Sequence, residues 1–286
     1  MQVYFNGKYL PKEEVCISPD DRGFLFADSI YEVMRSYDGR IFEIVAHIER
    51  LSYGARQLRF QMTDFGFLRK ICDDLLRMNG LLCGEAILYI QVTRGIAPRL
   101  HRFPSPDTSP TIYAETKPFT PDRDAMRQGI NVILLPDQRW ARCDIKTTGL
   151  TANVLAHQQA LDHDAQEAVF IRDSTVIEGT HSSVLAVFGG CLATPPLTNY
   201  MLGSITRRVV LELCRELRIP FSEKTILEEE FFKADEAMIA GTTAEITPIV
   251  KIGGRSIGDG KPGPITRRLQ AAFRGLCAEN RKRGES

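Results

Sequence analysis

Hydrophobic residues in the first 120 positions recur with two periods, that of a β-strand and that of an α-helix. Short apolar runs, some ended by turn pairs such as Asn6-Gly7 and Asp38-Gly39, predict strands and hairpins at residues 3–5, 8–10, 15–17, 30–37, 40–42, 86–94 and 111–116. Apolar stripes at helical spacing predict helices over residues 46–58 and 63–79. Residues 20–28 and 95–110 show neither period and are expected to be loops.

The segment 117–123 holds two prolines and no periodicity, which is typical of a linker. We therefore expect a small N-terminal α/β domain, residues 1–118, and a larger C-terminal α/β domain, residues 119–286, that carries Lys146. In the second domain the pattern predicts strands at 130–136, 168–172, 176–179, 183–188, 191–193 and 237–240 and helices at 151–162, 204–217 and 264–280. The fold class expected from this order is α+β or mixed α/β.

Composition narrows the class of protein. Lys plus Arg and Asp plus Glu both number 36, and this balance disfavours a dedicated nucleic-acid-binding protein. The seven cysteines form no Cys-x-x-Cys pair and the five histidines no His-Glu-x-x-His motif, so we expect reduced thiols and no metal site. There is no signal-peptide pattern and no apolar run of membrane-spanning length, and together these features favour a cytoplasmic protein with no membrane partner.

The most informative stretch is 139–149, which holds the only tryptophan, Trp140, and joins a predicted strand to a predicted helix. At its centre, Lys146 follows the apolar Ile145. A lysine that is partly desolvated in such a position can lose its proton and act as an amine nucleophile. A lysine on a solvated face is ordinary, and the segment alone leaves both interpretations open.

Four other features have a chemical interpretation beside an ordinary one. Arg99 and His101 lie two residues apart, so in an extended segment they point to one side and can bind a carboxylate. Arg50, early in a predicted helix, and the small-residue turn Gly241-Thr242-Thr243 can bind phosphate. Glu178, after an apolar strand, can pair with a pyridinium N–H. The alternatives are a solvated basic loop, an exposed helical arginine and a turn glutamate.

These candidates form a set that a pyridoxal 5′-phosphate (PLP) enzyme requires. Such an enzyme needs an amine nucleophile, a carboxylate for the ring nitrogen, a phosphate-binding site and a binding site for the substrate carboxylate. Over nearly its whole length the chain resembles the fold-type IV PLP enzymes, and within them the bacterial D-amino acid aminotransferases. The resemblance is carried, in order, by residues 21–32, 47–51, 91–95, 99–101, 139–146, 176–179, 203–207 and 242–248.

The resemblance implies a role for each candidate. Lys146 would bind PLP as a Schiff base and move the proton, and Glu178 would face the ring nitrogen. Tyr31, Arg99 and His101 would hold the substrate carboxylate, with the 99–101 loop reaching in from the partner subunit of a homodimer. The remaining cofactor contacts would come from Arg50, Leu202, Ser204, Ile205, Thr206, Thr242 and Thr243.

The implied reaction is transamination of D-amino acids, such as D-alanine or D-glutamate, with 2-oxo acids such as 2-oxoglutarate or pyruvate. It would be ping-pong, through pyridoxamine phosphate. A branched-chain L-amino acid aminotransferase, an amine transaminase and an aminodeoxychorismate lyase share the fold, and the Arg99-x-His101 pair disfavours all three. A non-catalytic PLP-binding protein is the alternative outside enzymes.

The chain departs from the family pattern at three places. Ala27 stands where relatives often have glycine before the aspartate of the first motif. After Glu178-Gly179 the usual pattern ends Ser-Asn, whereas this chain reads Thr-His-Ser-Ser, ending at Ser183. Gly241 stands where relatives often have serine, and the loss of that hydroxyl is expected to weaken cofactor retention.

Overall fold

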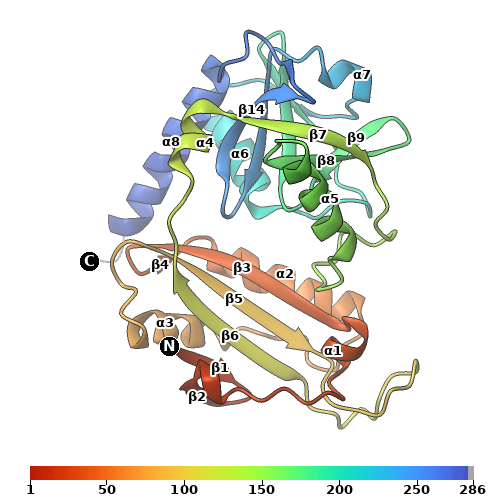
Figure 1. Ribbon diagram of the computed structural model, residues 1–286. Helices are drawn as coiled ribbons and strands as arrows, with labels where there is room; N and C mark the ends of the chain where they lie inside the picture. Colours follow the sequence, from red (N-terminus) through yellow and green to blue (C-terminus); the bar gives the residue numbers. More distant parts are fainter. Residues whose placement is uncertain (283–286) are drawn as a thin grey trace. The chain divides into compact units, whose positions relative to one another are not determined.

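The chain forms two compact units in the computed structural model, which describes the backbone of residues 1–282 and the side chains of residues 1–278 (Figure 1). The first unit contains Met1–Thr120 and Ile145–Gly149, and the second contains Pro121–Asp144 and Leu150–Cys277. Lys146 thus belongs to the first unit, whereas the sequence analysis placed it in the C-terminal domain. The reason lies in tertiary contacts: Ile145 is 4% exposed in the core of the first unit, and Thr147 forms an antiparallel bridge with Ile30.

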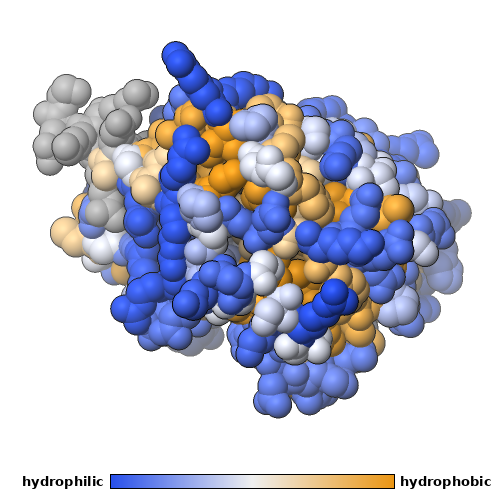
Figure 2. Space-filling model, turned by 90° about the horizontal axis from the view of Figure 1, so that it is seen from above, coloured by the Kyte–Doolittle hydropathy of each residue, from blue (hydrophilic) through white to orange (hydrophobic). Residues whose placement is uncertain are grey.

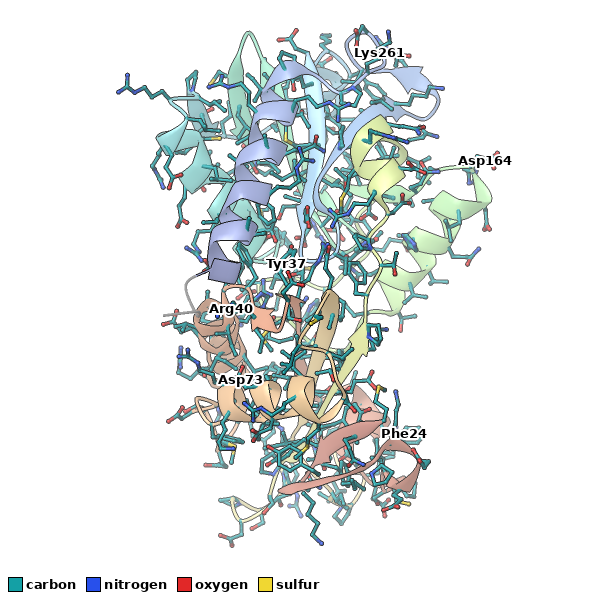
Figure 3. All side chains as sticks on the ribbon, turned by 90° about the vertical axis from the view of Figure 1, so that its left-hand side faces the viewer. Phe24, Tyr37, Arg40, Asp73, Asp164 and Lys261 are labelled. Carbon is teal, nitrogen blue, oxygen red and sulfur yellow. The ribbon has the colours of Figure 1, made fainter. Side chains whose placement is uncertain are left out.

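An antiparallel sheet in the order β2-β1-β6-β5-β3-β4 forms the first unit. Its strands are β1 (Gln2–Phe5), β2 (Lys8–Pro11), β3 (Ser29–Tyr37), β4 (Arg40–Ile41), β5 (Glu85–Thr93) and β6 (Thr111–Pro118). Asn6-Gly7 joins β1 to β2, and Asp38-Gly39 joins β3 to β4, where Tyr37 pairs with Arg40 (Figure 3). All four turn residues have positive φ, as a tight two-residue hairpin turn requires. Both predicted hairpins are confirmed.

Helices α2 (Ile44–Gln57) and α3 (Leu68–Met78) pack on this sheet and complete its core. Leu51 of α2 and Leu75 of α3 are buried against sheet residues such as Met34 and Leu88. The predicted helix over 63–79 begins only at Leu68, because the Asp64 side chain accepts a hydrogen bond from the Gly66 N–H and forms a turn instead.

Two predictions for the N-terminal region are wrong. Residues 15–17 form no strand, and the expected loop at 20–28 contains a short helix, α1 (Arg22–Phe26). The Asp21 carboxylate accepts the Gly23 N–H at 2.7 Å and caps this helix. A 3₁₀ turn, η1 (Lys12–Glu14), precedes it.

The second unit is a mixed sheet in the order β12-β11-β10-β13-β14-β7-β8-β9, with β15 paired to β14. The pairs β11–β12, β14–β7 and β7–β8 are parallel, and the others are antiparallel. Its strands are β7 (Ile130–Pro136), β8 (Glu167–Arg172), β9 (Thr175–Gly179), β10 (Ser183–Phe188), β11 (Cys191–Thr194), β12 (Phe221–Glu223), β13 (Glu236–Gly241), β14 (Glu245–Ile252) and β15 (Arg255–Ser256). The mixed α/β class is confirmed.

Helices cover both faces of this sheet and enclose separate apolar clusters. Helix α5 packs on β7 and β8, where Ala160 and Phe170 are buried together, whereas Phe231 of α7 is buried in a second cluster with Val169, which points to the other face of β8. The helices of this unit are α4 (Arg123–Gln128), α5 (Thr151–Asp162), α6 (Ile205–Glu216), α7 (Glu228–Phe231) and, up to Cys277, α8 (Pro264–Lys282). Helix α4 was not predicted. It begins at Arg123, the last residue of the predicted linker, and Asp122 caps it by accepting the Ala125 N–H.

Within residues 1–282, no helix combines the length and apolar character needed to cross a membrane. On the face drawn in Figure 2, bands of hydrophobic residues lie between hydrophilic ones. Such a mixture is ordinary for the surface of a folded protein, where apolar atoms contribute much of the accessible area.

Ala27 closes α1 in the left-handed region, with φ of 52°. Glycine adopts this conformation without the steric cost that a Cβ imposes, so Ala27→Gly is expected to raise the free energy of unfolding by up to about 1 kcal/mol. Ala46→Gly is the matched control, because Ala46 lies within α2 and its replacement should lower that free energy by roughly 0.5–1 kcal/mol. Urea unfolding of both variants measures the change in the free energy of unfolding. A change in the same direction for both would contradict the strain at Ala27.

Candidate active site

Lys146 is half-buried and lies beside the start of β3. Its carbonyl accepts the Tyr31 N–H at 3.0 Å, and its Nζ lies 4.2 Å from the centroid of the Tyr31 ring. The Thr148 and Ser29 hydroxyls also form a hydrogen bond, so the chain from Lys146 to Thr148 runs beside the start of β3. The structure therefore brings together two predicted site residues that lie far apart in the sequence.

A buried carboxylate organises Arg50, which lies in the middle of α2 rather than at its N-terminus. Glu32 is 0% exposed and accepts two hydrogen bonds from the Arg50 guanidinium, at 2.7 and 2.8 Å. His47 Nδ1 lies 2.7 Å from the same carboxylate. Burial alone would raise the pKa of Glu32, but the charge and hydrogen bonds of Arg50, with those of His47, hold that pKa well below its usual range. Burial lowers the pKa of His47 despite the opposing effect of Glu32.

The three predicted carboxylate-binding residues do not form one cluster in the described contacts. Tyr31 lies beside Lys146, and its ring is 5.8 Å from that of Tyr89. Arg99 and His101 are exposed, and both pack on the Phe26 ring of α1, at 5.1 and 5.6 Å from its centroid. The Arg99–His101 pair therefore presents both side chains on one side of the loop, as its spacing predicts.

Sequence reasoning missed the ion network that holds this loop. Arg22 is 4% exposed, pairs with Asp28 at 2.8 Å, and donates to the Leu100 carbonyl at 2.7 Å. Arg94 also pairs with Asp28 and donates to the Leu58 carbonyl. A carboxylate shared by two guanidinium groups therefore anchors the segment that carries Arg99 and His101. Arg22 and Asp28 both lie in the segment 20–28, which was expected to be a loop.

In the second unit, Glu178 ends β9 and is 6% exposed. Its Oε1 accepts a hydrogen bond from Arg139 at 2.5 Å, and its Oε2 accepts the Leu202 N–H at 3.1 Å. Arg139 was not predicted to have a role. It also pairs with Asp137 and stacks 4.2 Å from the centroid of the Phe170 ring. Burial opposes its charge, yet Asp137 and Glu178 hold the pKa of the Arg139 guanidinium above its usual value.

The bond from Leu202 N–H to Glu178 places the carboxylate beside the segment that enters α6. The Ser204 side chain caps this helix by accepting the Arg207 N–H at 3.1 Å. The amides of Ile205 and Thr206 belong to the first turn and have no acceptor within the helix. Both residues are buried, at 7% and 5% exposed. This end of α6 therefore presents two backbone donors and the positive end of the helix dipole.

The Gly241-Thr242-Thr243 turn joins β13 to β14 in the same unit. A Cβ on Gly241 would lie 3.4 Å from the His181 carbonyl oxygen and 3.8 Å from Ser182 Cα. The turn is thus beside residues 181–182, which follow Glu178. A carboxylate, the N-terminus of α6 and a hydroxyl-bearing turn surround the end of β9, and this donor set fits a molecule with a ring nitrogen and a phosphate, as PLP has.

Comparisons with known proteins agree with this chemistry. The family model described as amino-transferase class IV matches residues 29–252. The D-alanine aminotransferase of Staphylococcus haemolyticus is 41% identical over 95% of this chain and 96% of its own. The Escherichia coli branched-chain amino acid aminotransferase is 27% identical, with a TM-score of 0.90 over 96% of this chain and 94% of its own.

A third match is the branched-chain aminotransferase of Thermobaculum terrenum, solved in its PLP form. It is 26% identical, with a TM-score of 0.84 over 98% of this chain and 94% of its own. The predicted resemblance to fold-type IV aminotransferases, with PLP as the cofactor, is confirmed. The family model covers well over half of the chain, and the curated relative matches nearly all of it, so the chain belongs to the class IV aminotransferase family.

Proposed function

We propose that this enzyme transfers the amino group of D-amino acids to 2-oxo acids, with PLP as its cofactor. The observation that carries the substrate class is the identity to proteins named D-alanine aminotransferase, at 38–41% over at least 95% of both chains. The solved branched-chain aminotransferases share the fold at 22–27% identity. A branched-chain L-amino acid substrate is therefore the second candidate.

Lys146 is assigned the covalent and proton-transfer roles. PLP, when bound, supplies an electron sink that stabilises negative charge at the substrate Cα. With PLP bound, Lys146 Nζ would take the proton from the substrate Cα on one fixed face and deliver it to the carbon on the other side of the amino nitrogen. The Tyr31 ring beneath Nζ limits the directions in which this flexible side chain points.

Glu178 is assigned to the ring nitrogen and Arg139 to the orientation of Glu178. A carboxylate next to a ring nitrogen keeps that nitrogen protonated, which the electron sink requires. Arg139 and the Leu202 N–H fix one oxygen each, so the carboxylate has a defined plane. Phosphate binding is assigned to Arg50, Ser204, Ile205, Thr206, Thr242 and Thr243, and a ring contact to Leu202.

We further propose that Tyr31, Arg99 and His101 bind the substrate carboxylate and that the 99–101 loop acts on the site of a second subunit. Arg99 and His101 are exposed in the single chain, as are the neighbouring apolar residues Ile96 and Leu100, at 53% and 48%. Phe24 of α1 is 75% exposed and points outward in Figure 3. Exposed apolar side chains around a functional loop are typical of a subunit interface.

The seven cysteines support a cytoplasmic location, because all of them are free thiols. Free cysteines persist in reducing compartments, whereas disulfides form and persist in oxidising ones. Fractionation of the source cells with an antibody against the chain tests the location.

The activity is tested by half-reaction spectroscopy. The PLP form is mixed with D-alanine, L-alanine, D-glutamate, L-leucine and a simple primary amine in turn, and loss of the PLP absorbance is followed. Fast bleaching with the D-enantiomers and slow or no bleaching with the L-enantiomers is expected. Bleaching by L-leucine at a rate equal to or above that with D-alanine would instead favour the branched-chain activity.

A mixing experiment tests the shared site. Lys146→Ala and Arg99→Ala chains, each inactive at low substrate concentration, are unfolded together and refolded. If the loop acts across subunits, each mixed dimer contains one intact site, and statistical exchange should restore about a quarter of wild-type activity. A loop acting on its own chain would restore none. Sedimentation velocity on the unmixed protein should show a dimer.

Gly241→Ser is expected to slow the loss of PLP. The glycine has no positive φ, and its Cβ position meets neighbours only at ordinary van der Waals distance, so serine fits without strain. An added hydroxyl bond to a phosphate oxygen should tighten PLP binding by roughly tenfold, since hydrogen bonds to charged groups contribute about 1.5 kcal/mol. Dialysis against a PLP-trapping amine gives the rate, and Gly66→Ser is the control, because Gly66, in the turn before α3, also has no positive φ. An unchanged rate would remove Gly241 from the phosphate site.

A further inference from the structure

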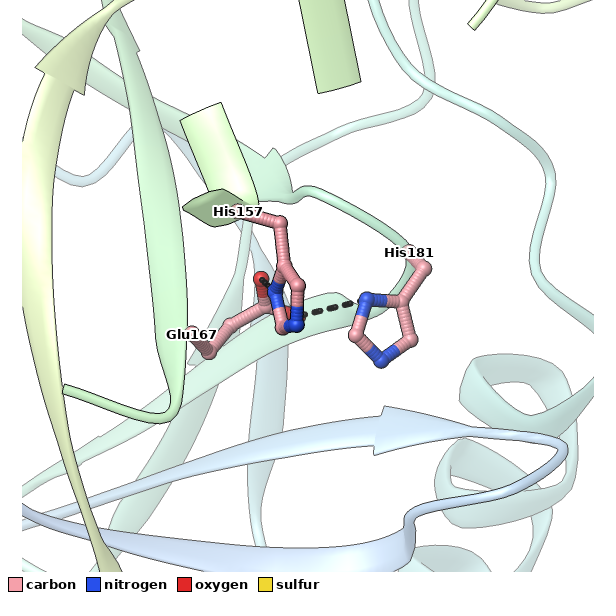
Figure 4. A group of neighbouring side chains, drawn as sticks. All are labelled: His157, Glu167 and His181. Atoms are coloured by element: carbon pink, nitrogen blue, oxygen red, sulfur yellow. Dashed lines mark ion pairs between the residues drawn. The ribbon is translucent and has the colours of Figure 1, made fainter. Parts of the chain in front are cut away.

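Three side chains that can bind a metal ion meet in the second unit. They are His157 on α5, Glu167 at the start of β8 and His181 in the loop after β9 (Figure 4). One ligand atom from each lies within 4.8 Å of the other two. His181 Nδ1 is 3.3 Å from Glu167 Oε2, and His157 Nδ1 is 3.9 Å from Glu167 Oε1.

Glu167 is fully buried and rigidly held. Its Oε1 accepts hydrogen bonds from the backbone N–H groups of Ala168 and Thr180 and from the Thr180 hydroxyl. Its Oε2 accepts the Ser182 hydroxyl at 2.9 Å. Neutral donors of this kind orient a carboxylate without neutralising its charge, as the hydrogen bonds around metal-binding carboxylates do.

The two histidines have few contacts of their own. His181 Nδ1 shares one hydrogen bond, of 3.0 Å, with the Thr180 hydroxyl, and a bound ion would take its place. His157 Nδ1 is buried and has no hydrogen-bond partner among the described residues, while the side chain as a whole is 37% exposed. The His181 side chain is 52% exposed, and its ring meets that of His157 edge to face at 5.4 Å. Two partly exposed imidazoles therefore converge on one buried carboxylate, with solvent access from one side.

We propose that His157, Glu167 and His181 bind one divalent transition-metal ion, of which Zn²⁺ is the type. In a tetrahedral zinc site the metal–nitrogen and metal–oxygen distances of about 2.0–2.2 Å place ligand atoms roughly 3.3–3.5 Å apart. The Glu167–His181 distance already meets this spacing, and the solvent-exposed rings can rotate to close the others. The fourth position faces solvent, so the ion exchanges with solution.

The donor set selects the class of ion. Two imidazoles and one carboxylate suit Zn²⁺, Co²⁺, Ni²⁺ and Cu²⁺, whereas Mg²⁺ and Ca²⁺ prefer oxygen ligands. The spacing of the histidines and acidic residues along the chain does not indicate this site, and the sequence alone predicted no metal site. The fold creates it by bringing α5, β8 and the 180–182 loop together, and His181 stands in the segment that departs from the family pattern.

Metal binding would restrain the loop next to the proposed PLP contacts. His181 lies three residues after Glu178, and its carbonyl oxygen is the nearest atom to the Cβ position of Gly241. An ion that joins this loop to α5 and β8 therefore fixes a segment between the ring-nitrogen carboxylate and the Gly241-Thr242-Thr243 turn. The proposed metal site itself rests on no part of the proposed activity.

The proposal is tested with the tag-free full-length chain, freed of metal and of unbound PLP, titrated calorimetrically with ZnCl₂. One Zn²⁺ per chain is expected, and His157→Gln and His181→Gln should each weaken binding at least about tenfold. His163→Gln is the matched control, because His163 lies at the end of the same α5 and bonds only to the Gln159 carbonyl in the described contacts.

Cobalt gives an independent readout. Co²⁺ should produce the intense visible bands of a four-coordinate site in the wild-type chain and in His163→Gln, and not in His157→Gln/His181→Gln. Both histidines are partly exposed, so circular dichroism should show that these variants fold. Absence of stoichiometric Zn²⁺ binding, or binding that the double variant retains, would overturn the proposal.

Discussion

Lys146→Ala is expected to lower the rate of transamination by roughly 10⁴-fold or more, because one side chain is assigned both the nucleophilic and the general-base role. The loss should be chemical rather than structural. The backbone of this segment is held by the Tyr31 N–H and by the Thr147 bridge to Ile30, neither of which involves the lysine amine. The half-buried side chain itself contributes a contact with the Tyr31 ring, worth about 1 kcal/mol at such a site.

The measurement is single-turnover bleaching of the PLP form with D-alanine, together with borohydride reduction and mass spectrometry. The wild-type chain should gain one pyridoxyl group on Lys146, and Lys146→Ala none. Lys146→Arg keeps a positive charge next to the Tyr31 ring and should be as inactive as Lys146→Ala. Lys117→Ala removes an exposed lysine from the same unit and should behave as wild type. A pyridoxyl group fixed elsewhere on an active Lys146→Ala chain would assign the chemistry to another lysine.

The elements with strong periodicity were predictable from sequence. Strand β7 and helix α5 match the predicted residues 130–136 and 151–162 at both ends. Those that were missed depend on side-chain caps, since Asp21 and Asp122 begin helices of only five and six residues. A hydrophobic repeat needs more than one or two turns to be visible, so short helices give no periodic signal.

The domain membership of Lys146 was not predictable, because it depends on a long-range pairing between Thr147 and Ile30. The same holds for Arg139, whose partner Glu178 lies 39 residues further along the chain. The family resemblance supplied the candidate residues and their roles. It did not supply the carboxylates that hold them, Glu32 for Arg50 and Asp28 for the 99–101 loop, because an ion pair between buried side chains leaves no pattern in one sequence.

Glu32→Gln is expected to lower the free energy of unfolding by about 3–5 kcal/mol, the range for breaking one partner of a buried ion pair. Gln keeps the size of the side chain but leaves the Arg50 guanidinium, whose side chain is 13% exposed, without its counter-charge. The amide also cannot accept from Arg50 and His47 with both terminal atoms. Glu49→Gln is the control, because Glu49 is exposed on the same helix and its replacement should change stability by less than about 0.5 kcal/mol.

The stability of the wild-type chain should also depend on pH in a way that Glu32→Gln does not. The pKa of Glu32 is lowered in the folded state, so its contribution is fully present above 4.5, the ordinary value for this group, and is lost as pH falls toward the folded pKa. Below pH 4.5 the difference between wild type and variant should shrink by roughly 1.4 kcal/mol per pH unit. Urea unfolding between pH 5 and pH 3.5 measures this slope. Hydrogen exchange of the β3 amides shows whether the pH-dependent loss of stability occurs in the first unit. A difference that stays constant over this range would mean that Glu32 is not held as a carboxylate by Arg50 and His47, and that Arg50 is positioned by other contacts.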